Sequence, residues 1–480
     1  MPMKSQTWFT SFPARRGGAT MIAAPACLVF FLILTATLQT KTELPKSDPT
    51  TELRVRVEAY LATDDSKEQA RLVKEIEELA KGDISLIESA IKDAKPWKAD
   101  VPPEGIVGLP HLNSWPADAQ PKASYYLPED YSVDRKYPIV LALAAQPYAE
   151  WLEATKSALD LPPSVVVLFN PNLGSSLAHG AAWSELNSAM LRETARMFSI
   201  DESRIYLIAD QERAAAAWNI LLSGADRFAG AVIHAGHPDL PYPAQSYPLF
   251  IQNLRYTPVL VKEDLPDRTP PSDSAEVMPV GSAQLRALES LATKEGIPLK
   301  VIRSSAKEAS VSPWRAEAQA LLDRTRPSQV QKISHWFAGP AQGSAWWLRA
   351  TKLEGTPWDA QQVSILTRAD TPHDDFITGF FGEHLALLSG EMADNTITVQ
   401  THHCSKIEIY LTAGMIDWSR PVTITVNGIK RYDSVPLPSI KTMLLEASDG
   451  HSSHPVRAVI ALDVHADPPR RRGKVSPPAP

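Results

Sequence analysis

The chain has 480 residues, which is more than one ordinary domain holds, and its length predicts about two to four folded units. Its formal net charge of −7 argues against a nucleic-acid-binding protein, because binding to phosphates needs a basic surface. The two cysteines, Cys27 and Cys404, exclude an intrachain disulfide framework, because Cys27 lies inside an N-terminal apolar segment.

The N-terminal residues 1–38 have the pattern of a signal anchor. Lys4, Arg15 and Arg16 precede an uncharged apolar run, Met21–Leu38, whose length is at the lower edge of what crosses a bilayer. The run is longer than the usual core of a cleaved signal peptide. Because the basic residues favour the cytoplasmic side, we expect a membrane anchor with the bulk of the chain exported. A cleaved signal and a secreted protein is the alternative.

Residues 39–50 are polar and proline-containing, and we interpret them as a linker to a helical module at 51–95. Apolar residues recur with helical spacing in three groups of that module: Leu53, Val57, Tyr60 and Leu61, then Leu72, Ile76 and Leu79, then Ile84, Ile87 and Ile91. Gly82 is expected to end the second helix. We interpret residues 95–120, rich in proline and tryptophan, as a further linker.

Residues 121–327 alternate apolar runs with amphipathic segments. The runs contain many β-branched residues and lie at 138–145, 164–171, 204–209, 230–236, 258–261 and 299–303. Continuous apolar runs predict strands that are buried on both faces. We therefore expect an α/β domain with a mainly parallel sheet between two layers of helices. Functional groups in such domains lie at the carboxyl ends of the strands.

Residues 330–467 show strand-like alternation and no long helix, which predicts an all-β sandwich. The pair Asn427-Gly428 is typical of a two-residue hairpin turn. Residues 468–480, rich in proline and arginine, are expected to be a disordered tail.

The 121–327 domain resembles the α/β-hydrolase superfamily, in particular bacterial secreted esterases, polyhydroxybutyrate depolymerases and the catalytic domain of prolyl oligopeptidases. Two stretches carry the resemblance: "ASYYLPEDYSVDRKYPIVLAL", and "FSIDESRIYLIADQERAAAAWNILLSGADRFAGAVIHAG". Trp218, Asp226-Arg227-Phe228 and Gly236 fall where those proteins have them. The resemblance implies the hydrolase fold, with the nucleophile on a sharp turn between a strand and a helix.

The chain departs from the family pattern at each catalytic position of that turn and of the oxyanion loop. Gln211 stands where the family has its nucleophilic serine, and Ala209 and Arg213 replace the flanking glycines. The oxyanion loop corresponds to residues 144–147, where Pro147 lacks a backbone N–H.

The two remaining members of the catalytic triad are also in question. Asp267 falls at the position of the family's acid, but Glu308 falls at the position of the histidine. The resemblance therefore implies a degenerate site, in which Asp267 is at most a remnant, and a protein that binds an unknown small molecule or protein instead of hydrolysing an ester.

Three further residues leave room for an active hydrolase with another mechanism. Asp210 precedes Gln211 and could supply a carboxylate, although the simpler interpretation is that it caps the following helix. His234 and His237 end the next strand and could serve as a base or as metal ligands. A pair of histidines without a third ligand is a weak metal signal, and we expect no metal and no cofactor.

The β-domain supports a third hypothesis, a glycan-binding envelope protein. Its tryptophans are Trp336, Trp346, Trp347, Trp358 and Trp418. They could stack on sugars, although burial in the core is the commoner outcome. His402-His403-Cys404 could also suggest a metal, but adjacent side chains of one strand point to opposite faces, which disfavours chelation by both histidines.

Overall fold

The structure is a computed structural model of the chain. It describes residues 48–95, 101–112, 115, 120–169, 180–234, 236, 247–265, 280–305, 313–354, 382, 384–450 and 454–465. Among the helices of these residues, none is both long and apolar enough to cross a bilayer. The predicted anchor at 21–38 and the predicted tail at 468–480 lie outside the described residues.

Three helices form the N-terminal module, at α1 (Pro49–Ala62), α2 (Ser66–Ala80) and α3 (Ile84–Asp93). An aspartate side chain caps each of them, from Asp48, Asp65 and Asp83, by accepting backbone N–H groups of the first turn. The chain leaves α2 through two residues with positive φ, of which Gly82 is the second. The predicted helical faces are confirmed, because nearly all of the apolar residues named above are buried.

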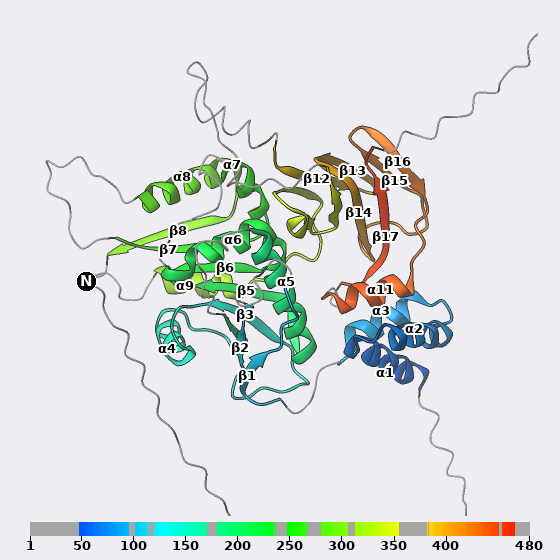
Figure 1. Cartoon of the computed structure of the whole chain (residues 1–480), viewed down its shortest axis with the longest axis horizontal. Helices are drawn as coiled ribbons and strands as arrows, with labels where there is room; N and C mark the ends of the chain where they lie inside the picture. The colour runs from blue at the N-terminus through cyan, green and yellow to red at the C-terminus, as the bar shows by residue number, and fades with distance from the viewer. Residues whose placement is uncertain are drawn as a thin grey trace, which may run out of the picture. The chain divides into compact units, whose positions relative to one another are not determined.

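These three helices share their core with a fourth, α11 (Ile440–Ser448), which comes from the far end of the chain (Figure 1). Met443 and Leu444 of α11 are fully buried against Val57, Ile76 and Ile87. The sequence did not predict α11, which is short and lies within the stretch interpreted as all-β.

An eight-stranded sheet forms the centre of the α/β domain, with the strand order β1-β2-β4-β3-β5-β6-β7-β8. The strands are β1 (Glu104–Val107), β2 (Ala123–Tyr126), β3 (Tyr137–Leu143), β4 (Val165–Phe169), β5 (Ile200–Ala209), β6 (Gly230–His234), β7 (Val259–Leu265) and β8 (Leu299–Ser305). β1 and β2 are antiparallel to their neighbours, and the rest run parallel. The six apolar runs are all strands, as predicted. The interpretation of residues 95–120 as a linker is wrong at β1, which pairs with β2 at the sheet edge.

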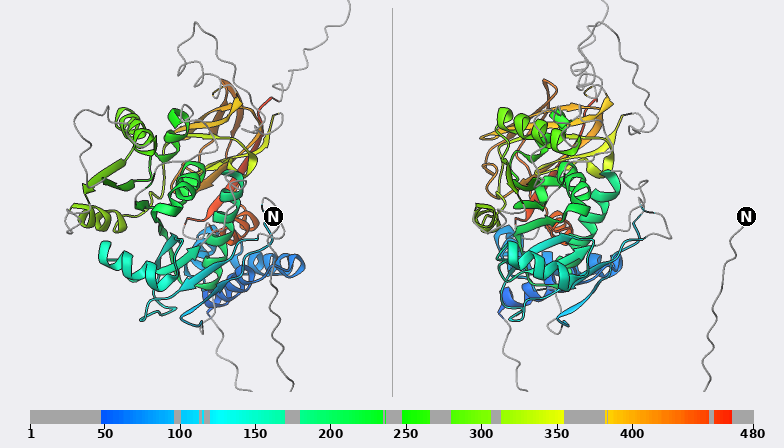
Figure 2. Two further views of the ribbon diagram at one scale, coloured as in Figure 1. Left: turned by 60° about the vertical axis from the view of Figure 1, so that its left-hand side comes forward. Right: turned by 90° about the vertical axis from the view of Figure 1, so that its left-hand side faces the viewer.

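Helices cover both faces of this sheet (Figure 2). The helices of the domain are α4 (Tyr148–Ala158), α5 (Gly180–Met197), α6 (Ala214–Gly224), α7 (Tyr247–Phe250), α8 (Val280–Glu295) and α9 (Pro313–Leu322). Side chains of α4 and α9 share one apolar cluster with the sheet, and those of α5, α6, α7 and α8 share a second. The predicted fold class, a mainly parallel α/β-hydrolase-like sheet flanked by helices, is confirmed.

The C-terminal part is a sandwich of two sheets around one core. One sheet has the order β10-β11-β14-β17 and the other β16-β15-β13-β12-β9. The strands are β9 (Lys332–Phe337), β10 (Ser344–Ala345), β11 (Leu348–Leu353), β12 (Ala386–Ala393), β13 (Thr396–His402), β14 (Cys404–Thr412), β15 (Val422–Val426), β16 (Ile429–Ser434) and β17 (Val456–Asp463). Asn427 and Gly428 join β15 to β16 and both have positive φ, which confirms the predicted hairpin turn.

Candidate functional site

The turn after β5 has the strand–turn–helix form that the resemblance predicted. β5 is buried over its last five residues and ends at Ala209, a 3₁₀ turn covers Gln211–Arg213, and α6 begins at Ala214. Trp218 of α6 is fully buried and anchors the helix on the sheet. The turn therefore presents its residues at the carboxyl edge of the sheet, where hydrolase-like folds carry their nucleophile.

Asp210 is the residue of this turn with the most perturbed environment. Its Oδ2 accepts the backbone N–H of Ala145 at 3.0 Å, and its own N–H donates to the Leu143 oxygen at 3.2 Å. Oδ1 is buried and has no hydrogen-bond partner among the described residues. Burial raises the pKa of the carboxyl group, and the backbone N–H groups of Ala145 and Arg213 oppose that rise.

The N-cap position of α6 itself is Arg213, and no side chain caps it there. Asp210 precedes the 3₁₀ turn that leads into α6, and the Arg213 N–H helps to lower its pKa, so the predicted cap is present only in part. The carboxyl group also points across the sheet edge to the loop after β3. That loop is the one that the resemblance equates with the oxyanion loop, so a backbone N–H of that loop is already bound to a carboxyl group of the chain itself.

The rest of the loop also lacks the features of an oxyanion hole. The Ala144 N–H donates to the Phe169 oxygen at 3.3 Å, and Pro147, which has no N–H, precedes the first turn of α4. An oxyanion hole needs N–H groups that are free to bind the developing charge. Residues 144, 145 and 147 offer none in this arrangement.

The other predicted site residues are only partly described. The backbone of Gln211 lies in the 3₁₀ turn, but its side chain is outside the described residues, as are His237, Asp267 and Glu308. His234 ends β6, is exposed, and its Nε2 lies 3.1 Å from Nζ of Lys262 on β7. The structure thus brings Asp210 to Ala145 and His234 to Lys262.

The tryptophans of the β-domain do not form an exposed platform in the part of the chain that is described. Trp347 is buried and its Nε1 donates to the Val330 oxygen at 2.8 Å. Trp336, Trp346 and Trp418 are half-buried, and Trp358 lies outside the described residues. Burial, the commoner outcome, is therefore closer to what the structure has than stacking surfaces for sugars.

His402 and His403 are close together, contrary to the expectation that they lie on opposite faces of one strand. His403 has a φ of +54° and turns the chain between β13 and β14, so the two ring centroids lie 4.1 Å apart. No group of three His, Cys, Asp or Glu side chains with metal-binding geometry occurs among the described residues. Burial raises the pKa of the Cys404 thiol to about 12, so it is not a thiolate at neutral pH.

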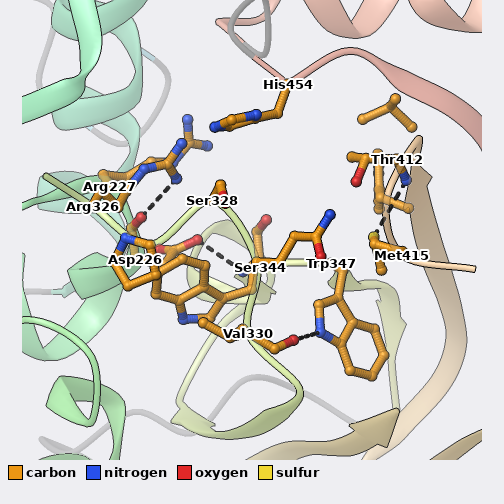
Figure 3. A pocket seen from close by; sticks show the side chains of 15 residues that line it. Asp226, Arg227, Arg326, Ser328, Val330, Ser344, Trp347, Thr412, Met415 and His454 are labelled. Atoms are coloured by element: carbon orange, nitrogen blue, oxygen red, sulfur yellow. Dashed lines mark hydrogen bonds between the residues drawn. The ribbon is translucent and has the colours of Figure 1, made fainter. Parts of the chain in front are cut away.

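Sequence reasoning missed a pocket at the opposite, amino edge of the sheet (Figure 3). Its polar residues include Arg227, Arg326 and His454, and Trp346 lies beside them. Arg227 had served only as a landmark of the resemblance. The three segments that meet here are far apart in the sequence, so no local pattern could have grouped them.

No family model and no curated protein matches the sequence. Among solved structures, the chain is similar to a thermostable esterase, with 17% identity over 43% of this chain and 59% of that chain and a TM-score of 0.32. It is also similar to a ferulic acid esterase, with 11% identity over 46% of this chain and 97% of that chain and a TM-score of 0.32. A third similar structure is ferric enterobactin esterase from Salmonella typhimurium, with 14% identity over 47% of this chain and 59% of that chain and a TM-score of 0.32. The match covers about three fifths of the first esterase. These likenesses are of fold alone.

Proposed function

We propose that the chain is an exported, membrane-anchored protein with a hydrolase-like fold that acts by binding a ligand or partner and does not hydrolyse esters. The single observation that carries the proposal is the Asp210 carboxylate bound to the Ala145 N–H, next to a glutamine at the nucleophile position. An anion fixed at the oxyanion loop repels the negative charge that develops on a substrate oxygen during acyl transfer.

Chemistry at the turn points the same way. A glutamine amide nitrogen is not nucleophilic, and removal of the nucleophile or of the base from a serine-hydrolase triad alone lowers the rate by several powers of ten. Loss of an oxyanion donor lowers it by about two to three further powers. A binding role does not depend on any of these groups.

A second candidate function, a hydrolase that uses Asp210 itself, is favoured by one feature. The carboxyl group has a raised pKa and a buried oxygen without a partner among the described residues, and such groups often act as acids or bases. The two candidates differ in what they predict for Asp210 variants.

The full-length chain, purified in mild detergent, should be assayed with p-nitrophenyl acetate and butyrate beside Gln211→Ala and Asp210→Asn variants. The proposal predicts that all three proteins stay at the uncatalysed background. A rate above background that Asp210→Asn abolishes and Gln211→Ala preserves would replace it with the second candidate. A rate that Gln211→Ala abolishes would mean that the turn itself is catalytic.

The membrane anchor is tested separately. Cells that express the full chain are broken, and the membranes are washed with alkaline carbonate, which strips peripheral proteins. We expect the chain to remain in the pellet, and a variant without Met21–Leu38 to be absent from it. Recovery of the unaltered chain, shortened at its N-terminus, in the soluble exported fraction would instead indicate a cleaved signal.

A further inference from the structure

The pocket at the amino edge of the sheet is open to solvent. Arg227 lies just before β6, and Arg326 binds β5 near its start, where the Arg326 N–H donates to the Ser203 oxygen at 2.7 Å. Because β5 and β6 run parallel, both arginines lie at the edge opposite to Asp210. The pocket is therefore separate from the hydrolase-like turn.

Neither guanidinium group forms a direct ion pair with a carboxylate of the described residues, although the charge of Arg227 lowers the pKa of Glu446. Arg326 Nη1 donates to the backbone oxygen of Asp226 at 2.9 Å, and its buried Nε has no hydrogen-bond partner among the described residues. Arg227 makes no hydrogen bond or ion pair with any described residue. Two neighbouring cations repel each other, and an anion that lies between them offsets this repulsion.

The nearby acidic residues offset part of this charge without forming a direct ion pair with either guanidinium group. The Asp226 carboxylate lines the pocket, where its Oδ2 accepts the backbone N–H of Trp346 at 2.9 Å and its charge acts on Arg326. Glu202 is near enough to raise the pKa of Arg326. Burial lowers the pKa of Arg326, and the charge of Arg227 lowers it further, while Asp226 and Glu202 oppose the shift.

A neutral hydrogen-bonding group completes the polar side. His454 faces the same pocket, and burial together with the charge of Arg326 lowers its pKa. It is therefore uncharged at neutral pH and can donate one hydrogen bond and accept another. In Figure 3 His454 and the arginines lie on one side of the pocket, and Thr412 and Met415 lie on the other.

Apolar surface forms the rest of the lining. Arg326 Cζ lies 5.8 Å from the centre of the Trp346 ring, so the indole forms a wall beside the guanidinium. Trp346 has a φ of +56°, a costly conformation for a tryptophan, and the Asp226 hydrogen bond holds it there. Val330, Trp347, Met415 and Val456 extend the apolar wall.

We propose that this pocket binds an organic oxyanion, a carboxylate or phosphate group carried on an apolar body. Arg227 and Arg326 bind the oxyanion, and the tryptophan wall contacts the body. Guanidinium groups match the planar and forked geometry of these anions. The inference goes beyond the proposed function, because the pocket would bind such a molecule whether or not the turn at Asp210 is catalytic.

The test is calorimetric titration of the full-length chain with three probes that share one ring: phenyl phosphate, phenylacetate and benzyl alcohol. We expect at least one anion to bind and the neutral alcohol to bind at least about tenfold more weakly, since each charged hydrogen bond contributes about that factor. The anion that binds tells whether the pocket takes phosphates or carboxylates.

Three variants locate the binding. Arg227→Gln should weaken anion binding by about tenfold or more. Arg326→Lys should also weaken anion binding, because the charge stays but the forked geometry of the guanidinium group is lost. Arg420→Gln is the control, since Arg420 is exposed and paired with Asp417 elsewhere in the β-domain. If Arg326→Lys does not fold, the effect of Arg227→Gln on anion binding tests the inference by itself.

Three outcomes would overturn the inference. One is equal binding of benzyl alcohol and the anions. Another is anion binding that Arg227→Gln leaves unchanged. The third is the absence of binding by both anions up to about 10 mM, weaker than any specific small-molecule site needs.

Discussion

Replacement of Glu88 by glutamine should destabilise the chain by about 2 kcal/mol. Glu88 lies on α3 and accepts two hydrogen bonds from Arg457 on β17, from Nε at 2.7 Å and from Nη2 at 2.8 Å. The two side chains are 11% and 20% exposed, and Arg457 Cζ lies 5.4 Å from the ring centre of Trp418. This pair links the N-terminal helices to the β-sandwich.

The magnitude follows from what remains after the substitution. Removal of one partner from a fully buried ion pair costs about 3–5 kcal/mol, because the other charge stays in the interior. Here the guanidinium keeps some contact with water and with the Trp418 ring, and glutamine still accepts one hydrogen bond. The loss is therefore nearer to that of one charged hydrogen bond, about 2 kcal/mol, or about thirtyfold in the folding equilibrium.

The assay is urea unfolding of the full-length chain followed by far-ultraviolet circular dichroism. Glu391→Gln is the matched control, because Glu391 pairs with Lys332 at 3.6 Å but both are about 65% exposed, so its loss should stay under about 0.5 kcal/mol. If Glu88→Gln and Glu391→Gln give the same small change, the pair does not stabilise the contact between the helices and the sandwich, and the reasoning is refuted.

Two further predictions concern buried groups. Glu446 on α11 is 8% exposed, and burial, followed by the charge of Asp449, raises its pKa to about 7. Since the folded pKa is above the unfolded value, the contribution of Glu446 to stability is highest below about pH 4.5 and falls as pH rises to about 7. Glu446→Gln should remove that fall, which is on the order of 2–3 kcal/mol. Urea unfolding measured from pH 4 to 8 checks this. Trp218→Ala should cost about 3–5 kcal/mol in urea unfolding, because the side chain is fully buried under the turn; a loss below about 1 kcal/mol would mean that α6 is not packed as described.

The fold was predictable where local pattern determines it. The apolar runs of the sheet are buried on both faces, so each strand was visible without its neighbours, as for β3, whose residues are all buried. The helix α11 was not visible, because its nine residues hold too few turns to establish a periodicity inside a β-rich stretch. Its position depends on the packing of Met443 and Leu444 against α1–α3, which lie far earlier in the sequence.

The candidate site was predictable in position but not in its contacts. The resemblance located the turn at Asp210 and Gln211, and the structure has the expected strand, turn and helix there. The hydrogen bond from Ala145 to Asp210 joins residues that are 65 positions apart, so the local rule that predicts a helix cap could not reveal it. For the same reason the pocket of Arg227, Arg326 and His454 left no trace in the sequence.

The two edges of the sheet differ in the sign of the charged groups that they carry. At the carboxyl edge the Asp210 carboxylate is bound by a backbone N–H of the chain itself, so an incoming substrate oxygen meets a site that is already negative. At the amino edge neither Arg227 nor Arg326 forms a direct ion pair with a described residue, and the nearby Asp226 carboxylate offsets part of their charge. A partly buried charge without a direct partner lowers the stability of the fold, and binding of an opposite charge reduces that cost. The amino edge is therefore where we expect a ligand to raise the stability of this protein, and the carboxyl edge is where we expect none.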